Sequence, residues 1–507
     1  EAVNKINSGH VRVYVRDPTK ITAQTDQTLP NFGPIGWNRV GGDIDGEAAV
    51  DNSGWSVSLS GDGTIVAIGA VRNDGNGHGS GHVRVYERDA ITDSWVQVGT
   101  DINGEAADDF IGHSVSLSYD GKIVAIGAIY NDGNGSGSGH VRVYEINTSN
   151  DWVQVGTDID GEDNWDQSGW RVSLSDNGTI VAIGAIYNGS NSGHVRVYER
   201  DATKITAQTN QTLPKFGPAG WNRVGEDIEG EAAYDLSGYS VSLSGDGTIL
   251  AIGAVLNDGN GSNSGHVRVY ERDASKTTAQ TNQTLPKFGP AGWNRVGEDI
   301  DGEAAGDESG YSVSLSYDGT IVAIGAFLKD NANWTNDGHV RIYVQDPNET
   351  IGWRQVGEDI DGETTYDNSG YSVSLSADGT TVAIGAPYND ANGSDSGHVR
   401  VYKIGNEFEK IISNLKIADT NNNSNLTALD GVVDELIYDT SFAVDLTKND
   451  WRQVGADIDG VAANLDYSGY SVSLSKNGKT MAIGAILNDC LDVGTSSLIV
   501  PSTSQGD

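Results

Sequence analysis

Acidic side chains recur at fixed places along the chain, and their types fit the ligands of a hard cation. One set is the Asp of a repeated D-x-x-G motif, and the other is the Asp of a repeated N-D-G-N-G or N-D-A-N-G loop. Calcium binds six to eight oxygens from carboxylates, carbonyls and water, which such loops offer. We therefore predict calcium as a cofactor, bound by these aspartates: Asp51, Asp74, Asp109, Asp132, Asp235, Asp258, Asp367 and Asp390.

Turn geometry is the alternative explanation for these loops, because Asn, Asp and Gly are also the residues that tight turns prefer. The loops lack the bidentate Glu at the twelfth position of an EF-hand. Residues 206–228 and 278–300 are identical, so similarity between copies also fits recent duplication. The sequence leaves both interpretations open.

Histidines and serines recur without the spacing of a catalytic site. Seven of the nine histidines belong to a repeated G-H-V-R-V-Y motif, and His78 and His113 stand alone. No nucleophile elbow, Cys–His pair or phosphate-binding glycine loop before a helix is present. We therefore expect structural or solvated histidines, no catalytic residues and no enzymatic function. The seven repeated histidines are His10, His82, His140, His194, His266, His339 and His398.

Arginine and tryptophan recur with the same period. The Arg of G-H-V-R-V-Y is expected to pair with the Asp of V-G-x-D-I in its own blade, because the planar guanidinium suits a carboxylate. These aspartates run from Asp43 to Asp457. The Trp that begins each V-G-x-D-I segment is expected to pack at the outside of the fold, with a sugar-stacking ring as the alternative.

All these residues sit in one unit that occurs seven times. The unit reads W-x-x-V-G-x-D-I, an acidic stretch with D-x-x-G, S-V-S-L-S, an Asp-Gly or Asn-Gly pair, V-A-I-G-A, a polar loop and G-H-V-R-V-Y. Each unit holds four short β-rich runs, which is typical of a four-stranded antiparallel propeller blade. In the first complete unit we expect strands at 55–60, 65–70, 82–87 and 95–102. The sequence thus predicts an all-β, seven-bladed β-propeller.

The two ends of the chain each carry half a blade. The last unit stops after Ala485, and the missing third and fourth strands lie at 9–14 and 37–44. We predict one domain over 1–490 whose last blade combines 466–487 with 9–44, because closing the ring removes exposed sheet edges. The start of the sequence in mid-repeat suggests a processed or incomplete N-terminus. An insertion at 403–450 belongs to the sixth blade, and 491–507 is expected to form a tail.

The run from Ser369 to Asp390, S-G-Y-S-V-S-L-S-A-D-G-T-T-V-A-I-G-A-P-Y-N-D, resembles an FG-GAP repeat. That family is related to the β-propeller of integrin α-subunits, and the similarity extends over all seven units. The resemblance implies an extracellular or envelope-associated module for adhesion or recognition. Integrin-type blades carry a long D-x-N-G-D-G-x-x-D calcium loop between their first two strands. Here a short Asp-Gly or Asn-Gly turn stands in its place, so that calcium site does not carry over.

The net charge of the chain limits the classes of partner that it can bind. The 507 residues carry a formal charge of −39, which repels nucleic acid and anionic membranes. No apolar run approaches the roughly 20 residues that span a bilayer, so no membrane insertion is expected. One cysteine, Cys490, allows no internal disulfide. Twelve N-x-S/T sequons, among them Asn134, Asn188, Asn260, Asn333 and Asn392, would allow glycosylation of a secreted protein.

We therefore expect an extracellular or cell-surface scaffold for recognition or cell adhesion. It would bind a protein partner or self-assemble through the face that carries the insertions between third and fourth strands. Three of these insertions are versions of T-A-Q-T-N-Q-T-L-P-K-F-G-P-A-G, and the fourth is the longer segment 403–450. The alternative function is a carbohydrate-binding lectin, with calcium as an aid to binding.

Overall fold

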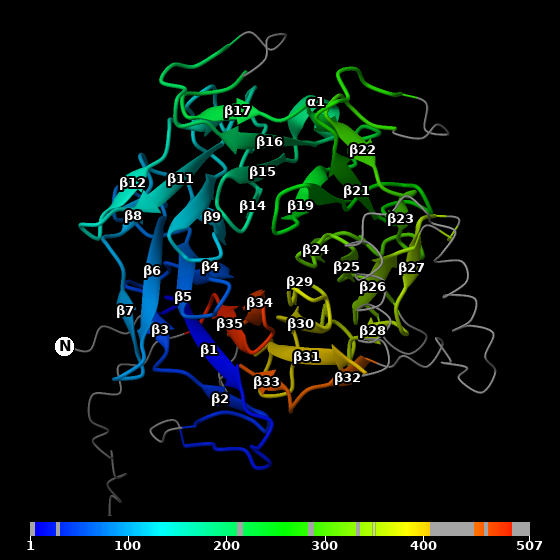
Figure 1. Cartoon of the computed structure of the whole chain (residues 1–507). Coiled ribbons are helices and arrows are strands. Elements are labelled where there is room, and N and C mark those ends of the chain that lie inside the picture. Colours follow the sequence, from blue (N-terminus) through cyan, green and yellow to red (C-terminus); the bar gives the residue numbers. More distant parts are fainter. Residues whose placement is uncertain are drawn as a thin grey trace, which may run out of the picture.

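Seven antiparallel sheets stand around a central axis like the blades of a propeller (Figure 1). The structure is a computed structural model that describes residues 6–26, 31–209, 216–281, 288–330, 335–346, 348–349, 351–405, 451–460 and 465–488. Within these residues one helical turn occurs, α1 (Asn188–Asn191), and no helix is long and apolar enough to cross a bilayer. The predicted all-β seven-bladed propeller is confirmed.

Four strand positions repeat from blade to blade. The first strands lie nearest the axis and are β4 (Ser53–Leu59), β9 (Ile111–Leu117), β14 (Arg171–Leu174), β19 (Ser237–Leu243), β24 (Ser312–Leu315), β29 (Ser372–Leu375) and β34 (Ser468–Leu474). The second strands are β5 (Ile65–Ala70), β10 (Ile123–Ala128), β15 (Ile180–Ala185), β20 (Ile249–Ala254), β25 (Ile321–Ala326), β30 (Thr381–Ala386) and β35 (Thr480–Ala485). The third strands are β6 (His82–Asp89), β11 (His140–Ile146), β16 (His194–Arg200), β21 (His266–Arg272), β26 (His339–Gln345), β31 (His398–Ile404) and β1 (His10–Arg16).

The fourth strand of every blade is interrupted, which the sequence analysis missed. In place of one strand over 95–102, the chain forms β7 (Ser94–Gln97) and β8 (Ile102–Asn103), both paired with β6. Gly99 between them has a φ of +71°, which breaks the extended conformation. The other interrupted strands are β12 (Trp152–Gln154) and β13 (Ile159–Asp160), β17 (Trp221–Arg223) and β18 (Ile228–Glu229), β22 (Trp293–Arg295) and β23 (Ile300–Asp301), β27 (Trp353–Gln355) and β28 (Ile360–Asp361), β32 (Trp451–Gln453) and β33 (Ile458–Asp459), and β2 (Trp37–Arg39) and β3 (Ile44–Asp45).

Strands from both ends of the chain close the ring, as predicted. The sheet order is β2-β1-β35-β34, and β1 pairs antiparallel with β35 from His10 opposite Ala485 to Val15 opposite Thr480. The blue and red ribbons therefore meet in one sheet in Figure 1. Most of the insertion at 403–450 and the tail at 491–507 lie outside the described residues.

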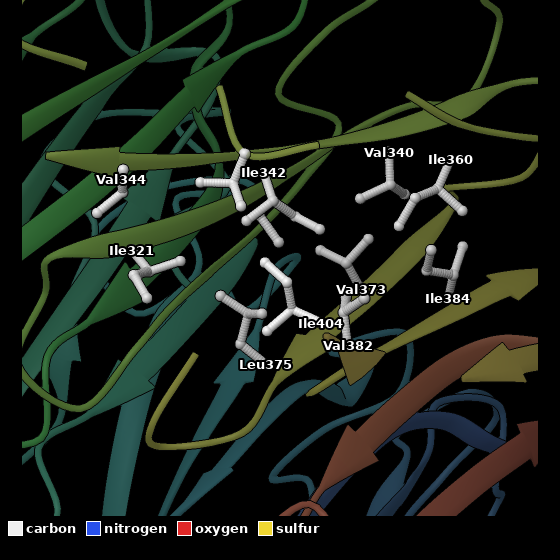
Figure 2. Close-up of a cluster of buried hydrophobic side chains, with 12 residues drawn as sticks. Ile321, Val340, Ile342, Val344, Ile360, Val373, Leu375, Val382, Ile384 and Ile404 are labelled. Carbon is white, nitrogen blue, oxygen red and sulfur yellow. The ribbon is translucent and has the colours of Figure 1, made fainter. Parts of the chain in front are cut away.

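Hydrophobic side chains fill the space between neighbouring blades. In Figure 2, residues of β25 and β26 such as Ile321 and Ile342 face Val373 and Val382 of the next blade. Consecutive residues are buried along each V-A-I-G-A strand, because both faces of the sheet are covered. Cohesion of the ring therefore comes from contacts between consecutive blades.

Small residues near the axis let adjacent blades approach each other. A Cβ on Gly484 would lie 2.2 Å from the carbonyl oxygen of Gly54. The hydroxyl of Ser471 donates to that same carbonyl at 2.7 Å, and Ser473 accepts from the backbone N–H of Leu59 at 2.9 Å. The serines of S-V-S-L therefore join neighbouring blades by hydrogen bonds.

The repeated tryptophans join blades at the outside of the ring. The indole N–H of Trp37 donates to the carbonyl of Val454 at 2.9 Å, and Trp221 donates to Val155 at 3.0 Å. Both side chains are fully buried. The five other indoles, those of Trp95, Trp152, Trp293, Trp353 and Trp451, make the same bond to the preceding blade. All seven tryptophans therefore pack between blades at the outside of the ring. The fully buried rings of Trp37, Trp221, Trp293 and Trp353 cannot stack on a sugar, whereas Trp95, Trp152 and Trp451 are partly exposed.

Candidate functional site

One rim of the ring carries the acidic loops, where each chain segment passes from one blade into the next. The Asp of D-x-x-G is buried there and shapes its own loop. Oδ2 of Asp367 accepts hydrogen bonds from the backbone N–H groups of Glu363 and Thr364 and from the side chain of Asn389. Asp51, Asp109 and Asp235 make the equivalent bonds to a backbone N–H three residues earlier and to Asn73, Asn131 and Asn257.

The second set of predicted calcium ligands lies in the neighbouring loop. Oδ1 of Asp74 accepts from the backbone N–H of Gly79 at 2.8 Å, and Oδ1 of Asp132 accepts from that of Gly137 at 2.7 Å. Asp258 and Asp390 accept in the same way from Asn263 and Asp395. The rim therefore brings both sets together through the Asn that precedes each of these aspartates. At least one oxygen of each predicted ligand shapes a turn, and the calcium site stays a prediction.

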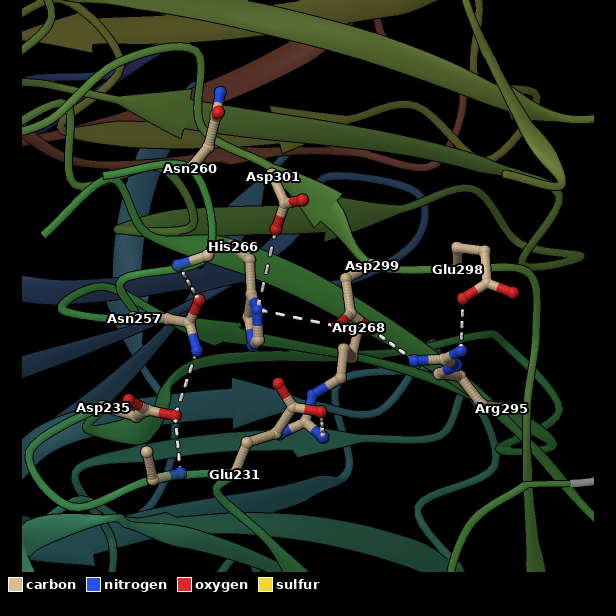
Figure 3. Close-up of polar contacts among 12 residues, drawn as sticks. Glu231, Asp235, Asn257, Asn260, His266, Arg268, Arg295, Glu298, Asp299 and Asp301 are labelled. Carbon is tan, nitrogen blue, oxygen red and sulfur yellow. Dashed lines mark hydrogen bonds and ion pairs between the residues drawn. The ribbon is translucent and has the colours of Figure 1, made fainter. Parts of the chain in front are cut away.

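Histidine, arginine and carboxylates gather at each seam between blades, just below these loops. Figure 3 shows one copy, in which Nδ1 of His266 lies 4.0 Å from carboxylate oxygens of Asp299 and Asp301. Arg268 points to Glu231 of the preceding linker, with 3.4 Å between Nη1 and Oε1. The sequence places these groups together because His and Arg are two residues apart on β21 and so share one face.

The predicted pairing of this Arg with the Asp of V-G-x-D-I is wrong in most blades. It occurs for Arg12 with Asp43 and for Arg142 with Asp158. In the other five blades the Arg faces the linker Glu instead, as Arg84 faces Glu47 at 3.3 Å. The Asp of V-G-x-D-I instead contacts the Arg or Gln four residues before it, as in Arg223–Asp227 and Gln97–Asp101. The W-x-R/Q pattern was the overlooked sequence signal.

Crowding of charge at the seams shifts pKa values in both directions. Burial, together with nearby Asp227 and Glu162, raises the pKa of Glu229 to about 6. Burial and the adjacent Arg lower the pKa of His82, His140 and His398 to about 4. At neutral pH the seams therefore hold neutral imidazoles beside carboxylates that repel one another, and such perturbed groups mark candidate binding sites.

Seven aromatic side chains form a closed ring around the axis, which the sequence analysis missed. Adjacent ring centroids lie 4.7–5.7 Å apart around the whole circle. Each member follows a Gly that is preceded by Ser in six blades and by Ile in one, and the seven are Trp55, His113, Trp170, Tyr239, Tyr311, Tyr371 and Tyr470. The sequence signal was an aromatic residue in this position of every unit. His113 therefore has a structural role, and exposed His78 pairs with Asp108, as expected of the two isolated histidines.

Bulky apolar side chains stand exposed on the loop rim in a left-handed backbone conformation. The residue before the buried Asp has a positive φ in every blade, and in five blades it is large and apolar. Tyr234, Trp165 and Tyr366 have φ of 72°, 67° and 68° and are 66%, 58% and 59% exposed. Val50 and Leu465 are the other two. A left-handed conformation costs a non-glycine residue roughly 1–2 kcal/mol, so folding alone gives no reason to retain these side chains.

A pocket of about 590 Å³ opens on the same rim between the second and third complete blades. Phe110, Tyr130 and Trp165 supply aromatic walls, and Asp109, Asn131 and Asp132 are among its polar residues. Two of the predicted calcium ligands, Asp109 and Asp132, thus line one pocket. Phe110 and Tyr130 meet edge to face at 5.4 Å, which fixes one wall.

The solved structures that resemble the chain include two bacterial proteins. One is the periplasmic gluconolactonase of Pseudomonas aeruginosa, with 14% identity and a TM-score of 0.44 over 78% of this chain and 92% of that chain. The other is a putative 6-phosphogluconolactonase of Bacteroides uniformis, with 12% identity and a TM-score of 0.44 over 78% and 93%. No curated protein sequence matches the chain.

The expectation that the chain is not an enzyme is contradicted, because both similar structures are described as lactonases. The exclusion failed for a physical reason. A site on a propeller rim is assembled from loops of several blades, so its residues need not form any local sequence motif. At this identity and TM-score, however, the likeness carries no argument for a lactonase activity in this chain.

The family model of the FG-GAP repeat matches three segments, residues 44–86, 229–270 and 360–402. Each match begins at the end of a fourth strand, runs through the acidic linker and the first two strands, and ends on the third strand. Each therefore spans the rim loop, a seam histidine and an axial aromatic. The chain is a seven-bladed β-propeller that carries FG-GAP repeats.

Proposed function

We propose that this propeller is a recognition scaffold that binds a protein partner through the rim of acidic loops. The observation that supports it is the set of exposed apolar side chains held in left-handed conformations: Val50, Trp165, Tyr234, Tyr366 and Leu465. Tyrosine and tryptophan are the side chains that dominate binding energy in protein interfaces. The resemblance to integrin-type repeats supports a location outside the cell or at the cell surface.

The charge of the rim indicates the chemistry of the partner. Each linker contributes carboxylates, and Glu231 and Glu363 have raised pKa values because they are partly buried and lie near other carboxylates. A surface with apolar and basic residues would cover the aromatic side chains and relieve this repulsion. Binding should therefore weaken as salt is raised, because screening reduces the attraction between opposite charges.

A triple variant, Trp165→Gly, Tyr234→Gly and Tyr366→Gly, separates binding from folding. Glycine adopts a positive φ without penalty, so the variant should fold at least as stably as the native protein. A partner recovered from native material with the native protein is then purified and titrated against both proteins. We expect each truncation to weaken binding by about 2 kcal/mol, the value typical of a central interface residue.

Two exposed tyrosines elsewhere provide the control. Tyr119 and Tyr317 lie in the hairpins between first and second strands, at the opposite end of those strands from the rim loops, and are about half exposed. Tyr119→Ser with Tyr317→Ser should leave the affinity unchanged. Unchanged affinity in the triple variant would refute the proposal, as would equal losses in the control.

Glycan recognition is a second candidate, and the pocket next to Trp165 supports it. Its aromatic walls suit the apolar face of a sugar, while Asn131 and Asp132 offer hydrogen-bond partners for hydroxyls. A glycan array probed with the native protein and with a Phe110→Ala variant tests this candidate. Glycan binding by the native protein that is lost in the Phe110→Ala variant would favour a lectin. If the native protein binds no glycan on the array, binding of a protein partner remains the proposed function.

A further inference from the structure

We propose that the seam cluster of Glu47, His82 and Asp101 binds a divalent transition-metal ion such as Zn²⁺. Among the described residues, seven groups of at least three His, Cys, Asp or Glu side chains bring one ligand atom of each member within 4.8 Å of the others. Four further groups that join His to carboxylates are His10–Asp43–Asp45, Glu105–His140–Asp158, Glu162–His194–Asp227 and Glu231–His266–Asp299. These clusters are distinct from the aspartates predicted to bind calcium.

The buried imidazole points to a ligand. His82 is 1% exposed, and both of its ring nitrogens are buried without a hydrogen-bond partner in the described part of the chain. A buried polar atom without a partner costs free energy, so native structures rarely keep one. The same holds for both ring nitrogens of His398 in the sixth blade. A metal ion would satisfy one nitrogen of each ring.

Distances in the cluster suit ligands of one ion better than hydrogen bonds. Nδ1 of His82 lies 3.9 Å from Oε2 of Glu47 and 4.0 Å from Oδ2 of Asp101, which is too far for hydrogen bonding. Two atoms bound at about 2.1 Å to a tetrahedral zinc ion are separated by about 3.4 Å. Each carboxylate therefore needs to move by roughly half an ångström. Glu47 and Asp101 are 46% and 30% exposed, so the ion can enter from the rim.

Competing cations distinguish this cluster from its repeats. In the four other clusters named above an Asp pairs with an arginine: Arg12–Asp43, Arg142–Asp158, Arg223–Asp227 and Arg295–Asp299. Asp101 instead accepts from the neutral amide of Gln97 at 2.7 Å, and no Lys or Arg within the described residues lies at salt-bridge distance from it. Arg84 lies at salt-bridge distance from Glu47 and also donates to the backbone carbonyl of Asp45. Two negative charges thus meet one positive charge, and the remaining negative charge would attract a divalent ion.

The ligand types select the class of metal. One imidazole nitrogen with two carboxylates is a ligand set that zinc and its neighbours in the first transition row accept. Calcium binds oxygen ligands and would gain nothing from His82. Zinc and calcium are therefore expected to bind at different sites, zinc at the seam cluster and calcium at the aspartates of the rim loops.

Titration of the chelator-stripped full chain with Zn²⁺ by calorimetry, and with Co²⁺ by visible absorption, tests the site. The measurements use a His78→Ala background, because exposed His78 and Asp108 form a surface pair that could collect metal. Glu47→Gln removes one carboxylate from a half-exposed position, and Glu271→Gln, at the far exposed end of β21, is the matched control. We expect Glu47→Gln to weaken the affinity of this site by more than about tenfold, while Glu271→Gln leaves it unchanged.

Absence of zinc binding to the stripped protein would overturn the proposal. So would equal affinity and stoichiometry in Glu47→Gln and Glu271→Gln, or displacement of Co²⁺ by an equal concentration of Ca²⁺. A cobalt spectrum typical of nitrogen and oxygen ligands, lost together with the affinity in Glu47→Gln, would support it.

Discussion

Replacing His113 with Tyr should remove a defined part of the acid sensitivity of this protein. His113 is the histidine in the axial aromatic ring, where four other blades carry Tyr, so a tyrosine side chain suits the position. Burial, with a contribution from nearby Arg171, lowers the pKa of His113 from 6.5 to about 3. The neutral imidazole is therefore favoured in the folded state.

The size of the effect follows from proton binding by the two states. Below pH 6.5 the unfolded chain protonates this histidine while the folded protein does not, so stability falls as the pH falls toward 3. Between about pH 7 and pH 4.5 the loss amounts to about 2.5 kcal/mol for this one residue. The His113→Tyr variant should be spared this loss.

Denaturant unfolding followed by tryptophan fluorescence measures the effect at both pH values. The quantity of interest is the change in unfolding free energy between the two pH values, compared between variant and native protein, because every other titrating group is shared. His78→Ala is the control. Hydrogen bonding to Asp108 raises the pKa of exposed His78, so its removal acts in the opposite direction. Equal acid destabilisation of His113→Tyr and the native protein would refute the reasoning.

Three further substitutions or deletions test the ring. Gly385→Ala should destabilise the protein by about 3 kcal/mol in thermal or denaturant unfolding, because the new Cβ would lie 2.1 Å from the carbonyl oxygen of Gly469. As a control, Gly42→Ala should change the unfolding free energy by less than about 0.5 kcal/mol, because Gly42 has open space around it. Trp221→Phe should lower the unfolding free energy by about 1–3 kcal/mol in the same assay, because the carbonyl of Val155 loses its indole donor. A change within experimental error would show that this bond between blades does not stabilise the ring. Deleting residues 1–44 should yield aggregating protein by light scattering, because β35 becomes an open edge; a monomeric, cooperatively melting product would disprove closure.

Local patterns in the sequence were sufficient to predict most of the fold. The predicted second strand at 65–70 matches the structure residue for residue, because V-A-I-G-A is bounded by turn residues on both sides. Ring closure followed from counting half-blades at the two ends. The break in the fourth strand was missed because Gly99 adopts a positive φ that depends on its three-dimensional surroundings.

The contacts of the candidate site were harder to predict from the sequence, since they depend on which of several charged neighbours pair in the folded protein. Every unit has an Arg equivalent to Arg84 and an Asp equivalent to Asp101, at positions that suit an ion pair. In the structure, however, Gln97 donates to Asp101, and Arg84 lies next to Glu47. Such competition between partners is decided by distances across a seam. The axial aromatic ring was missed for a similar reason, because its members lie in separate blades and meet only when the ring closes.

Departures from the sevenfold repeat are the most informative residues for function. A contact present in all seven copies, such as the bond from each indole to the preceding blade, is explained by closure of the ring. Closure does not decide between the Gln of four copies, Gln97 among them, and the Arg of the other three, because the Asp is held by a hydrogen bond in either case. It also does not require Trp165 where another copy has Gly306, since both positions adopt a positive φ before a buried Asp. The metal site and the partner-binding rim are both assigned to positions where the chain departs from what the ring demands.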